Sequence, residues 1–428
     1  MTESFLHYIW QSQYFNKVDL FTTDGERLEI VKPGFQNTDA GPDFSHAKVN
    51  IGELAWSGHV EIHVQSSQWL QHQHTKDAAY DNVVLHVVYE HDTAVCRTDG
   101  TPIPTLELKG RIDTALTLNY QQLMTQSSPI PCSSSFHRVA DIVRLSMLDR
   151  AVVERLQMKA ESVLTQLKKN NNDWEETCYQ LLAKNFGFKV NSEPFLQLAE
   201  ALPYKVILKH SSQPLQVQAL LFGMAGFLEA GVNDEYFQTL RREFDLLTAK
   251  YQLDKKKVAP ARWKFLRLRP ANFPTLRLAQ LATLLTQTRG IFSRIVESEQ
   301  PAALRSLFEI ELHPYWQHHY RFGRKSNSNI SSLGTASIDN IIINTVAPLL
   351  AAYALHKDDV SYLDRAQALL NATEAEDNKI MRLWNDLQWT AKSAFDTQAL
   401  LQLHNMYCVR RQCLNCAIGA AILKPATA

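Results

Sequence analysis

The chain has 428 residues, enough for two or three domains, and its 45% hydrophobic content is that of a folded protein with a sizeable core. Lysine plus arginine and aspartate plus glutamate each number 44, so the formal net charge is zero. This balance excludes whole-chain electrostatic attraction to nucleic acid, and any such contact must rest on a local basic patch.

The N-terminal segment does not have the pattern of an export signal, because Glu3 is acidic and no basic stretch precedes an apolar run. The most apolar long segment, 338–355, is interrupted by polar residues and by Pro348, so we expect a buried helix there and no membrane partner. Six cysteines without an export signal indicate a reducing compartment, and we expect the protein to be cytoplasmic.

The first part of the chain has the pattern of a β domain preceded by a short helix. Residues 2–16 have apolar side chains at near-helical spacing and are expected to form an amphipathic helix. From residue 20 to about 112, strand and turn patterns alternate. The clearest predicted strands are 47–51, 55–65, 82–89 and 104–108, with turns at 23–26 and 52–53. Residues 113–136 are rich in Ser and Pro and are expected to be a connector.

The remainder of the chain has helical periodicity nearly throughout, without a fixed-period repeat. The expected helices include 139–168, 173–186, 193–201, 214–229, 233–251, 275–288, 337–354, 360–371 and 376–386. A polar stretch, 321–334, is expected to be a mobile loop. The predicted class is α+β, with a mixed β-sheet domain at 1–115, a linker at 116–138 and a large all-α domain at 139–428.

Acidic and histidine side chains are concentrated in the predicted β domain. Asp43 lies at the start of one strand, and the next strand contains His59, Glu61, His63 and Gln65 at alternate positions. Because side chains alternate faces along a strand, these four project together, while the intervening valines and isoleucine face a core. The pattern predicts one polar, ligand-capable face.

An aspartate, a hairpin and then Glu-x-His on the second strand resemble the motif of the PD-(D/E)XK metal-dependent nuclease superfamily. The resemblance covers residues 1–110 and implies a restriction-endonuclease-like domain that binds Mg²⁺ or Mn²⁺. It implies that Asp43 and Glu61 are metal ligands, that His63 stands where the family has lysine, and that Gln65 is an associated polar residue. Glu3 would be the accessory acid that some members carry.

Two other interpretations of the same residues remain open. Six of the 15 histidines fall between residues 59 and 91, and His59, His63, His74 and His86 are an alternative ligand set for Zn²⁺ or Fe²⁺. The plainer interpretation is that the histidines are ordinary strand residues and that Asp43, after a proline, is a turn residue.

The C-terminal cysteines have metal-ligand spacing. Cys408, Cys413 and Cys416 follow one another closely, and Cys132 is the best candidate for a fourth ligand. One distant cysteine with three near the C-terminus resembles the iron–sulfur staple of some nucleases in the same superfamily, which implies that the chain's end is tied back to the nuclease domain. Zn²⁺ is chemically as reasonable as an iron–sulfur cluster, and free thiols remain the alternative.

Two segments of the helical region mix cations with aromatic residues, as surfaces that bind DNA or RNA do. The first contains Arg267 and Arg269, and its aromatic residues have an alternative role in the core. The second contains Arg321, Arg324 and Lys325 beside the polar loop, and is the better candidate for nucleic-acid contact.

Further segments carry a second resemblance, which spans nearly all of the chain. They include TTDG (23–26), NTDAGPDF (37–44), GHVEIHVQSSQW (58–69), YDNVVLHVVYEHD (80–92), LLFGMAGFLE (220–229), HYRFGRKS (319–326) and CLNCAIG (413–419). The chain resembles an uncharacterised bacterial family known only as a domain of unknown function. This resemblance implies a shared architecture but no reaction.

The function predicted from the sequence is metal-dependent phosphodiester hydrolysis of nucleic acid. A non-catalytic module for binding nucleic acid or protein, with a degenerate motif, is the first alternative. A transition-metal enzyme that uses the histidine face is the second.

Overall fold

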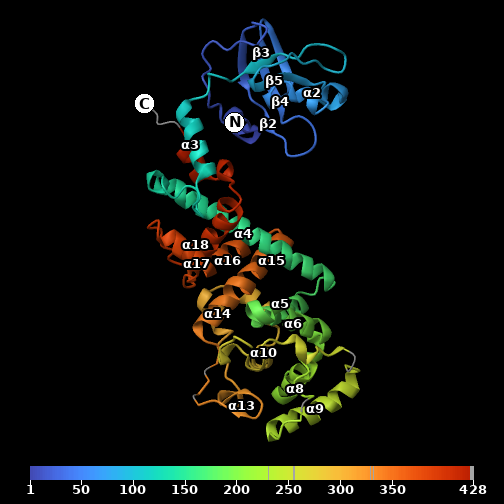
Figure 1. Cartoon of the computed structure of the whole chain (residues 1–428). Coiled ribbons are helices and arrows are strands. Elements are labelled where there is room, and N and C mark those ends of the chain that lie inside the picture. The colour runs from blue at the N-terminus through green and yellow to red at the C-terminus, as the bar shows by residue number, and fades with distance from the viewer. Residues whose placement is uncertain (230, 254–255, 328, 331, 425–428) are drawn as a thin grey trace. The chain divides into compact units, whose positions relative to one another are not determined.

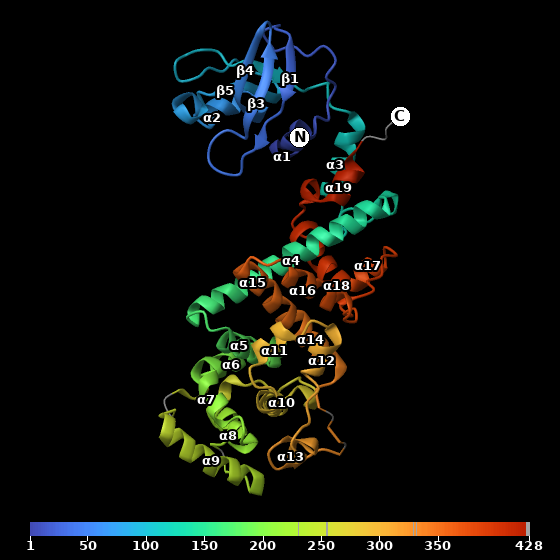
Figure 2. The same cartoon turned by 180° about the vertical axis from the view of Figure 1, so that it is seen from behind.

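The computed structural model describes residues 1–229, 231–253, 256–327, 329–330 and 332–424. These residues form two compact units (Figures 1 and 2). The first unit contains Met1–Met147 and the C-terminal segment from His404 onward, and the second contains Leu148–Leu403. A mixed sheet followed by a large helical region confirms the predicted α+β class.

The first unit is built on a mixed sheet in the order β1-β3-β4-β5-β6, with β2 paired to β3. The strands are β1 (Leu28–Lys32), β2 (Phe35–Gln36), β3 (Phe44–Ile51), β4 (Leu54–Gln65), β5 (Val83–Glu90) and β6 (Thr105–Glu107). β3 pairs antiparallel with β1 and β4, whereas β5 runs parallel to both β4 and β6. The central strand β4 is therefore where the sheet changes from antiparallel to parallel pairing.

A parallel neighbour needs a crossover connection, and the segment between β4 and β5 provides one. It consists of the short helix α2 (Gln68–Gln71) and the 3-10 turns η1 (His74–Lys76) and η2 (Ala78–Tyr80). The hairpin between β3 and β4, by contrast, closes at Gly52, whose φ of +60° suits glycine.

Helix α1 (Glu3–Ser12) packs against the sheet and contacts β4. The Thr2 side chain caps its start by accepting a hydrogen bond from the backbone N–H of Phe5. Phe5, Ile9 and Trp10 are fully buried along one face, as the predicted amphipathic helix requires.

The predicted connector contains a helix, α3 (Thr114–Thr125). Asp113 caps its start, and its buried residues repeat every three or four positions, a periodicity that the flanking Ser and Pro residues obscured in the sequence. These residues are Leu116, Tyr120 and Leu123. α3 lies beside the C-terminal helix α19 (Ala417–Leu423), although the two are far apart in the sequence (Figure 2).

The first unit therefore has different limits from the predicted β domain. It extends through the predicted linker 116–138 and includes the C-terminal segment, which the sequence placed with the helical domain 139–428. The additional elements are the 3-10 turn η3 (Phe136–Arg138), the π-helical segment η8 (Leu403–Cys408), the 3-10 turn η9 (Cys413–Asn415) and α19.

The second unit is helical, as expected. Helix α4 (Asp141–Lys169) contains the boundary between the units, at residue 147. The other helices are α5 (Trp174–Phe186), α6 (Phe188–Ala201), α7 (Tyr204–His210), α8 (Pro214–Met224), α9 (Glu235–Tyr251), α10 (Pro274–Gln287), α11 (Ile291–Glu297), α12 (Pro301–Ser306), α13 (Pro314–Gln317), α14 (Thr335–Ile341), α15 (Ala347–Lys357), α16 (Ser361–Asn371), α17 (Lys379–Asn385) and α18 (Ala394–Gln402), with short 3-10 turns at Pro260–Arg262 and Pro270–Asn272.

The polar stretch 321–334 begins in a small hairpin instead of being wholly a loop. Strands β7 (His319–Arg321) and β8 (Arg324–Lys325) pair antiparallel, and Gly323 in the turn has a φ of +67°. Ser328 and Ser331, which the loop prediction also covered, lie outside the described residues.

One helical stretch among the described residues, Thr335–Lys357, is long and apolar enough to cross a membrane. Within its most apolar window 78% is buried inside the protein, so it is a core helix, as predicted. It consists of α14, the π-helical segment η7 (Ile342–Val346) and α15.

Candidate functional site: a carboxylate and histidine cluster

Asp43 and Glu61, the two acids paired by the sequence, are adjacent in the structure. Asp43 directly precedes β3, and its backbone N–H donates to Glu61 Oε2 at 3.0 Å. In return, the backbone N–H of Ile62 donates to Asp43 Oδ2 at 2.9 Å. These two bonds interlock the start of β3 with the middle of β4, and they hold both carboxylates at one end of the hairpin.

The polar face of β4 is covered in this region. Glu61 is 5% exposed and His63 is 1% exposed, and the intervening Ile62 is fully buried. The sequence predicted a strand with one buried and one polar face, and it did not predict that helix α1 and the α2 crossover would both pack on the strand. Gln65 is different, because it is exposed at the end of β4 and stands apart from the acids.

Three imidazoles converge beside Glu61. One ligand-capable nitrogen from each of His63, His72 and His74 lies within 4.8 Å of the other two. Glu61 Oε1 is 3.4 Å from His74 Nε2 and 3.7 Å from His63 Nε2. The His63 Nε2 atom is also 3.1 Å from His72 Nδ1.

The convergence only partly matches the alternative ligand set that the sequence indicated. His63 and His74 belong to the cluster, and His86 supports it through a 2.9 Å hydrogen bond between its Nε2 and His63 Nδ1. The described structure places His59 outside the converging group, with its ring beside His46, and His72 takes its place. The spacing His-x-His at 72–74 was the feature in the sequence that pointed to His72.

His7 is a further member that the sequence analysis missed. Its Nε2 lies 3.2 Å from Asp43 Oδ2 and 3.9 Å from the Glu3 carboxylate. His7 thus contacts both Asp43 and Glu3, the residue that the resemblance implied as an accessory acid. The four-residue separation of Glu3 and His7 on one helix was the available signal.

Burial keeps the innermost imidazoles neutral. Desolvation, reinforced by the neighbouring imidazoles, lowers the pKa of His63 to about 2 and that of His86 to about 3. Neutral imidazole is the form that binds metal ions. Burial raises the pKa of Glu61 despite its contact with His74, and the nearby Asp43 charge acts in the same direction.

The cluster fits a divalent metal ion on chemical grounds. The Nε2 atom of His74 is buried and has no hydrogen-bond partner, although it points at a carboxylate oxygen. Carboxylate oxygens and neutral imidazole nitrogens together form a donor set for Mn²⁺, Fe²⁺ or Zn²⁺. A cation would offset the cost of the buried negative charge on Glu61.

A cavity of about 300 Å³ adjoins the cluster through His7. Its polar lining includes Gln11 from α1, and Arg411 and Gln412 from the C-terminal segment. Arg411 is fixed there by hydrogen bonds to the backbone oxygens of Leu123 and Gln126. The cavity provides space for a small polar group beside His7.

The four predicted cysteine ligands also come together in the first unit. Cys132, Cys408, Cys413 and Cys416 are all buried. Burial, reinforced by the neighbouring cysteines, raises the pKa of Cys132 to about 12 and that of Cys413 to about 11. Burial likewise raises the pKa of Cys408, and all three other cysteines contribute to that increase. Cys132, the distant cysteine that the sequence analysis named, thus lies near the three C-terminal ones.

Among the described residues, no three cysteine sulfurs lie within 4.8 Å of one another. Thiolates are ligands both for Zn²⁺ and for iron–sulfur clusters, so the chemistry of the four side chains suits either.

Close backbone packing maintains the cysteine region. A Cβ atom on Gly419 would lie 2.1 Å from the backbone oxygen of Cys413, so α19 approaches the η9 turn as only glycine permits. Asn119 on α3 donates to the backbone oxygen of Ile422, 3.2 Å away, and Tyr8 on α1 donates to that of Ala420 at 3.5 Å. The C-terminal segment is thus tied to the N-terminal helices.

In the second unit, the two basic segments predicted from the sequence lie side by side. The guanidinium of Arg321 lies 3.9 Å from the ring centroid of Phe265 and 4.6 Å from that of Phe273. Arg321 is therefore a packed residue that joins the segments. The exposed cations of the two segments are Arg267, Arg269, Arg324 and Lys325.

Comparison with known protein families gave one result. The sequence profile of the family described as "Protein of unknown function (DUF2851)" matches residues 3–379. The chain belongs to this family. The match covers both the β-sheet of the first unit and most of the helical unit, as the whole-chain resemblance implied. No curated protein and no solved structure shows a significant match.

Proposed function

We propose that this protein is a metal-dependent phosphodiesterase that acts on nucleic acid at Asp43 and Glu61. The observation that carries the proposal is the reciprocal hydrogen bonding of these two acids, which sets both carboxylates at one end of the β3–β4 hairpin. Their placement, on a mixed sheet preceded by a helix, suits the nuclease resemblance of the N-terminal sequence.

Asp43 and Glu61 would hold the ion, with His74 as a further ligand. When bound, the ion lowers the pKa of water and offsets negative charge on the phosphate. His7 borders the adjoining cavity, and although burial opposes its protonation, the contact with Asp43 raises its pKa. A protonated His7 would orient an anionic phosphate next to the carboxylates. His63, held by His86, positions the cluster from the buried side.

Nucleic acid is the proposed substrate because exposed cations gather around aromatic residues in the second unit. Arg267, Arg269, Arg324 and Lys325 are exposed there. Cations contribute affinity for any phosphate backbone, and aromatic rings provide faces on which bases stack.

A second candidate function is a histidine-ligated transition-metal centre. The observation that favours it is the convergence of His63, His72 and His74, since imidazole prefers Zn²⁺, Fe²⁺ or Cu²⁺ over Mg²⁺. Glu61 belongs to both proposed sites, whereas Asp43 belongs only to the first and His72 only to the second.

Cleavage assays separate these proposals. We expect wild type to cut labelled single- or double-stranded DNA or RNA with Mn²⁺ or Mg²⁺, and Asp43→Asn and Glu61→Gln to lose at least about 100-fold in rate. Asp39→Asn, an exposed residue in the same loop, is the matched control and should retain activity.

His72→Ala distinguishes the two metal sites. It should leave cleavage unchanged if Asp43 and Glu61 hold the ion, and should abolish ion binding if the imidazoles do. Wild-type protein that binds Mn²⁺ but cuts none of the four substrates would refute the phosphodiesterase and favour a non-catalytic binding module.

We propose that the cysteines hold an iron–sulfur cluster, with Zn²⁺ as the alternative. Support comes from four buried cysteines gathered in one region and from the resemblance of their spacing in the sequence to the iron–sulfur staple. Protein purified under nitrogen should be brown and absorb near about 400 nm, and Cys132→Ser should lose the colour. A colourless protein with about one zinc per chain would contradict the cluster.

We also propose a cytoplasmic location. None of the six cysteines forms a disulfide bond, as is usual for proteins kept in a reducing compartment. Fractionation of cells that express the protein at its natural level should recover it with the soluble cytoplasmic markers, and recovery outside the cytoplasm would contradict this location.

A further inference from the structure

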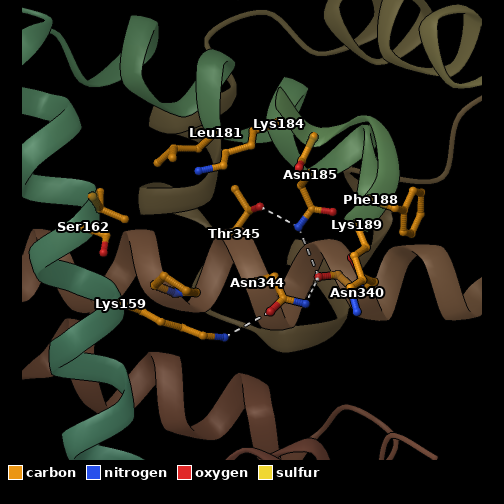
Figure 3. Close-up of a pocket in the computed structure, with 13 residues that line it drawn as sticks. Lys159, Ser162, Leu181, Lys184, Asn185, Phe188, Lys189, Asn340, Asn344 and Thr345 are labelled. Atoms are coloured by element: carbon orange, nitrogen blue, oxygen red, sulfur yellow. Dashed lines mark hydrogen bonds between the residues drawn. The ribbon is translucent and has the colours of Figure 1, made fainter. Parts of the chain in front are cut away.

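The second unit contains a cavity of about 520 Å³ that no part of the proposed hydrolysis uses. Figure 3 shows its lining residues, which come from α4, α5, α6 and the α14–α15 helix. Its volume falls in the range of sites that bind small organic molecules.

The charged groups of the cavity are all positive. Lys159, Lys184 and Lys189 line it, and none of its lining residues is acidic. Lys159 Nζ donates to Asn344 Oδ1 at 3.1 Å and to Gln398 Oε1 at 2.9 Å, which fixes its position in the wall. Lys184 and Lys189 are exposed at the rim, and no ion pair engages either within the described structure. The lining favours an anionic ligand.

Asn185 provides a second polar feature that points to a ligand. Its Nδ2 donates to Thr345 Oγ1 at 3.0 Å and to the backbone oxygen of Asn340 at 3.4 Å, so its orientation is set (Figure 3). Its Oδ1 is buried and has no hydrogen-bond partner. A buried acceptor without a partner is costly, and a ligand N–H or O–H group would satisfy it.

The helix that supplies Thr345 and Asn344 is distorted at this point. Residues Ile342–Val346 form a π-helical turn, and such turns occur often at functional sites. The turn places the side chains of both residues on the cavity wall. Pro348, one turn later, also lines the cavity and cannot donate a backbone hydrogen bond.

The wall also has apolar surface beside the serines Ser162 and Ser192, and one of its apolar residues has an unfavourable backbone conformation. Val163, Leu181 and Phe188 provide apolar surface. Phe188 has a φ of +48°, a region that bulky side chains rarely adopt. The Arg277 guanidinium covers its ring at 4.3 Å and holds it in place. The ligand should thus contain an apolar or aromatic part as well as its anionic group.

We propose that this cavity binds a small organic phosphate of the nucleoside monophosphate class. The dianionic phosphate would lie between Lys184 and Lys189, because a dianion balances two free ammonium groups better than a monoanionic carboxylate does. A base or sugar donor group would meet Asn185 Oδ1, and the base would lie against Leu181. The inference is independent of the proposed hydrolysis, since it uses no residue of the first unit.

Isothermal titration of the full-length protein with adenosine 5′-monophosphate tests this inference. We expect a single site on wild type, with weaker binding of adenosine and of inorganic phosphate alone, because each lacks half of the recognised groups. The double variant Lys184→Ala/Lys189→Ala should lose about 10- to 100-fold in affinity for the nucleotide. Asn185→Ala should lose about tenfold in affinity for the nucleotide, and its affinity for adenosine should fall by the same factor.

The double variant Lys205→Ala/Lys209→Ala is the matched control, because both lysines are exposed on α7 of the same unit and do not line the cavity. It should bind like wild type. Three outcomes would overturn the proposal: no heat of binding with millimolar nucleotide, equal losses in the two double variants, or tighter binding of phenylacetate, a carboxylate probe, than of the nucleotide. Circular dichroism identifies a variant that fails to fold. If Lys184→Ala/Lys189→Ala does not fold, the same nucleotide titration is made with the more conservative Lys184→Gln/Lys189→Gln, and its affinity tests the proposal.

Discussion

Replacing Glu61 by Gln should separate metal binding from folding. The Glu61 side chain is 7% exposed and accepts a hydrogen bond from the backbone of Asp43, which a glutamine oxygen can also accept. Burial raises the pKa of Glu61 in the folded protein above its ordinary value of 4.5. The folded state therefore binds the proton more tightly, and ionisation of Glu61 opposes folding as the pH rises from about 4.5. In EDTA at pH 7.5, we expect Glu61→Gln to be at least as stable as wild type.

A bound metal ion should make wild type more stable than Glu61→Gln. A divalent ion at 100 times its dissociation constant stabilises the folded state by about 2.7 kcal/mol. For a unit of this size each kcal/mol raises the melting temperature by about 2–4 °C, so wild type should gain about 5–11 °C. Glu61→Gln should gain almost nothing, because the ion loses a charged ligand.

Differential scanning fluorimetry with EDTA, Mn²⁺ or Zn²⁺ measures both effects. Glu53→Gln is the matched control, because Glu53 is exposed in the turn of the same hairpin, and it should keep the full gain. The reasoning is refuted if Glu61→Gln retains the ion-induced gain, or if its melting temperature in EDTA falls several degrees below that of wild type.

Three further predictions concern packing and charge. Gly419→Ala places a Cβ 2.1 Å from the Cys413 backbone oxygen. We expect the free energy of unfolding in urea to fall by about 2–4 kcal/mol and bound metal to be lost. Unchanged stability would contradict the close approach. Gly223 lies within α8, where replacing glycine by alanine ordinarily stabilises a helix. The Cβ of Gly223→Ala, however, would lie 2.2 Å from the Phe244 ring. The free energy of unfolding measured in urea should therefore fall by about 1–3 kcal/mol instead of rising. Burial lowers the pKa of Lys159 from 10.5 to about 7 in the folded protein. Between these two pH values the unfolded chain binds more protons than the folded protein. The free energy of unfolding therefore rises with pH, by at most about 1.4 kcal/mol per pH unit. Lys159→Met should remove this rise between pH 7 and 9, and parallel curves for the two proteins would contradict it.

The strands and the candidate ligands could be predicted from the sequence because each depends on local spacing. Alternation along 59–65 predicted a strand with Glu61 and His63 on one face, and the structure has both on β4. The proximity of Cys408, Cys413 and Cys416 follows from their short separations, since a few residues of chain limit how far apart they can be. Helix α3 was missed because turn-forming residues next to it outweighed three apolar positions in a short segment.

Long-range packing decided the rest, and no local pattern contains that information. The sequence could not tell that His72 would converge with His63 while His59 would not, because both are compatible with a strand or its crossover and the choice depends on how the α2 segment folds back onto β4. The same holds for the cavity near Lys159. Its three lysines belong to separate helices, and they meet Asn344, which lies more than 150 positions after them in the chain. The periodicity of a sequence determines which side of a helix or strand a residue occupies. Which residues meet depends on how the helices and strands pack against one another. That packing is the sum of many weak contacts over the whole unit, so no short segment of sequence specifies it.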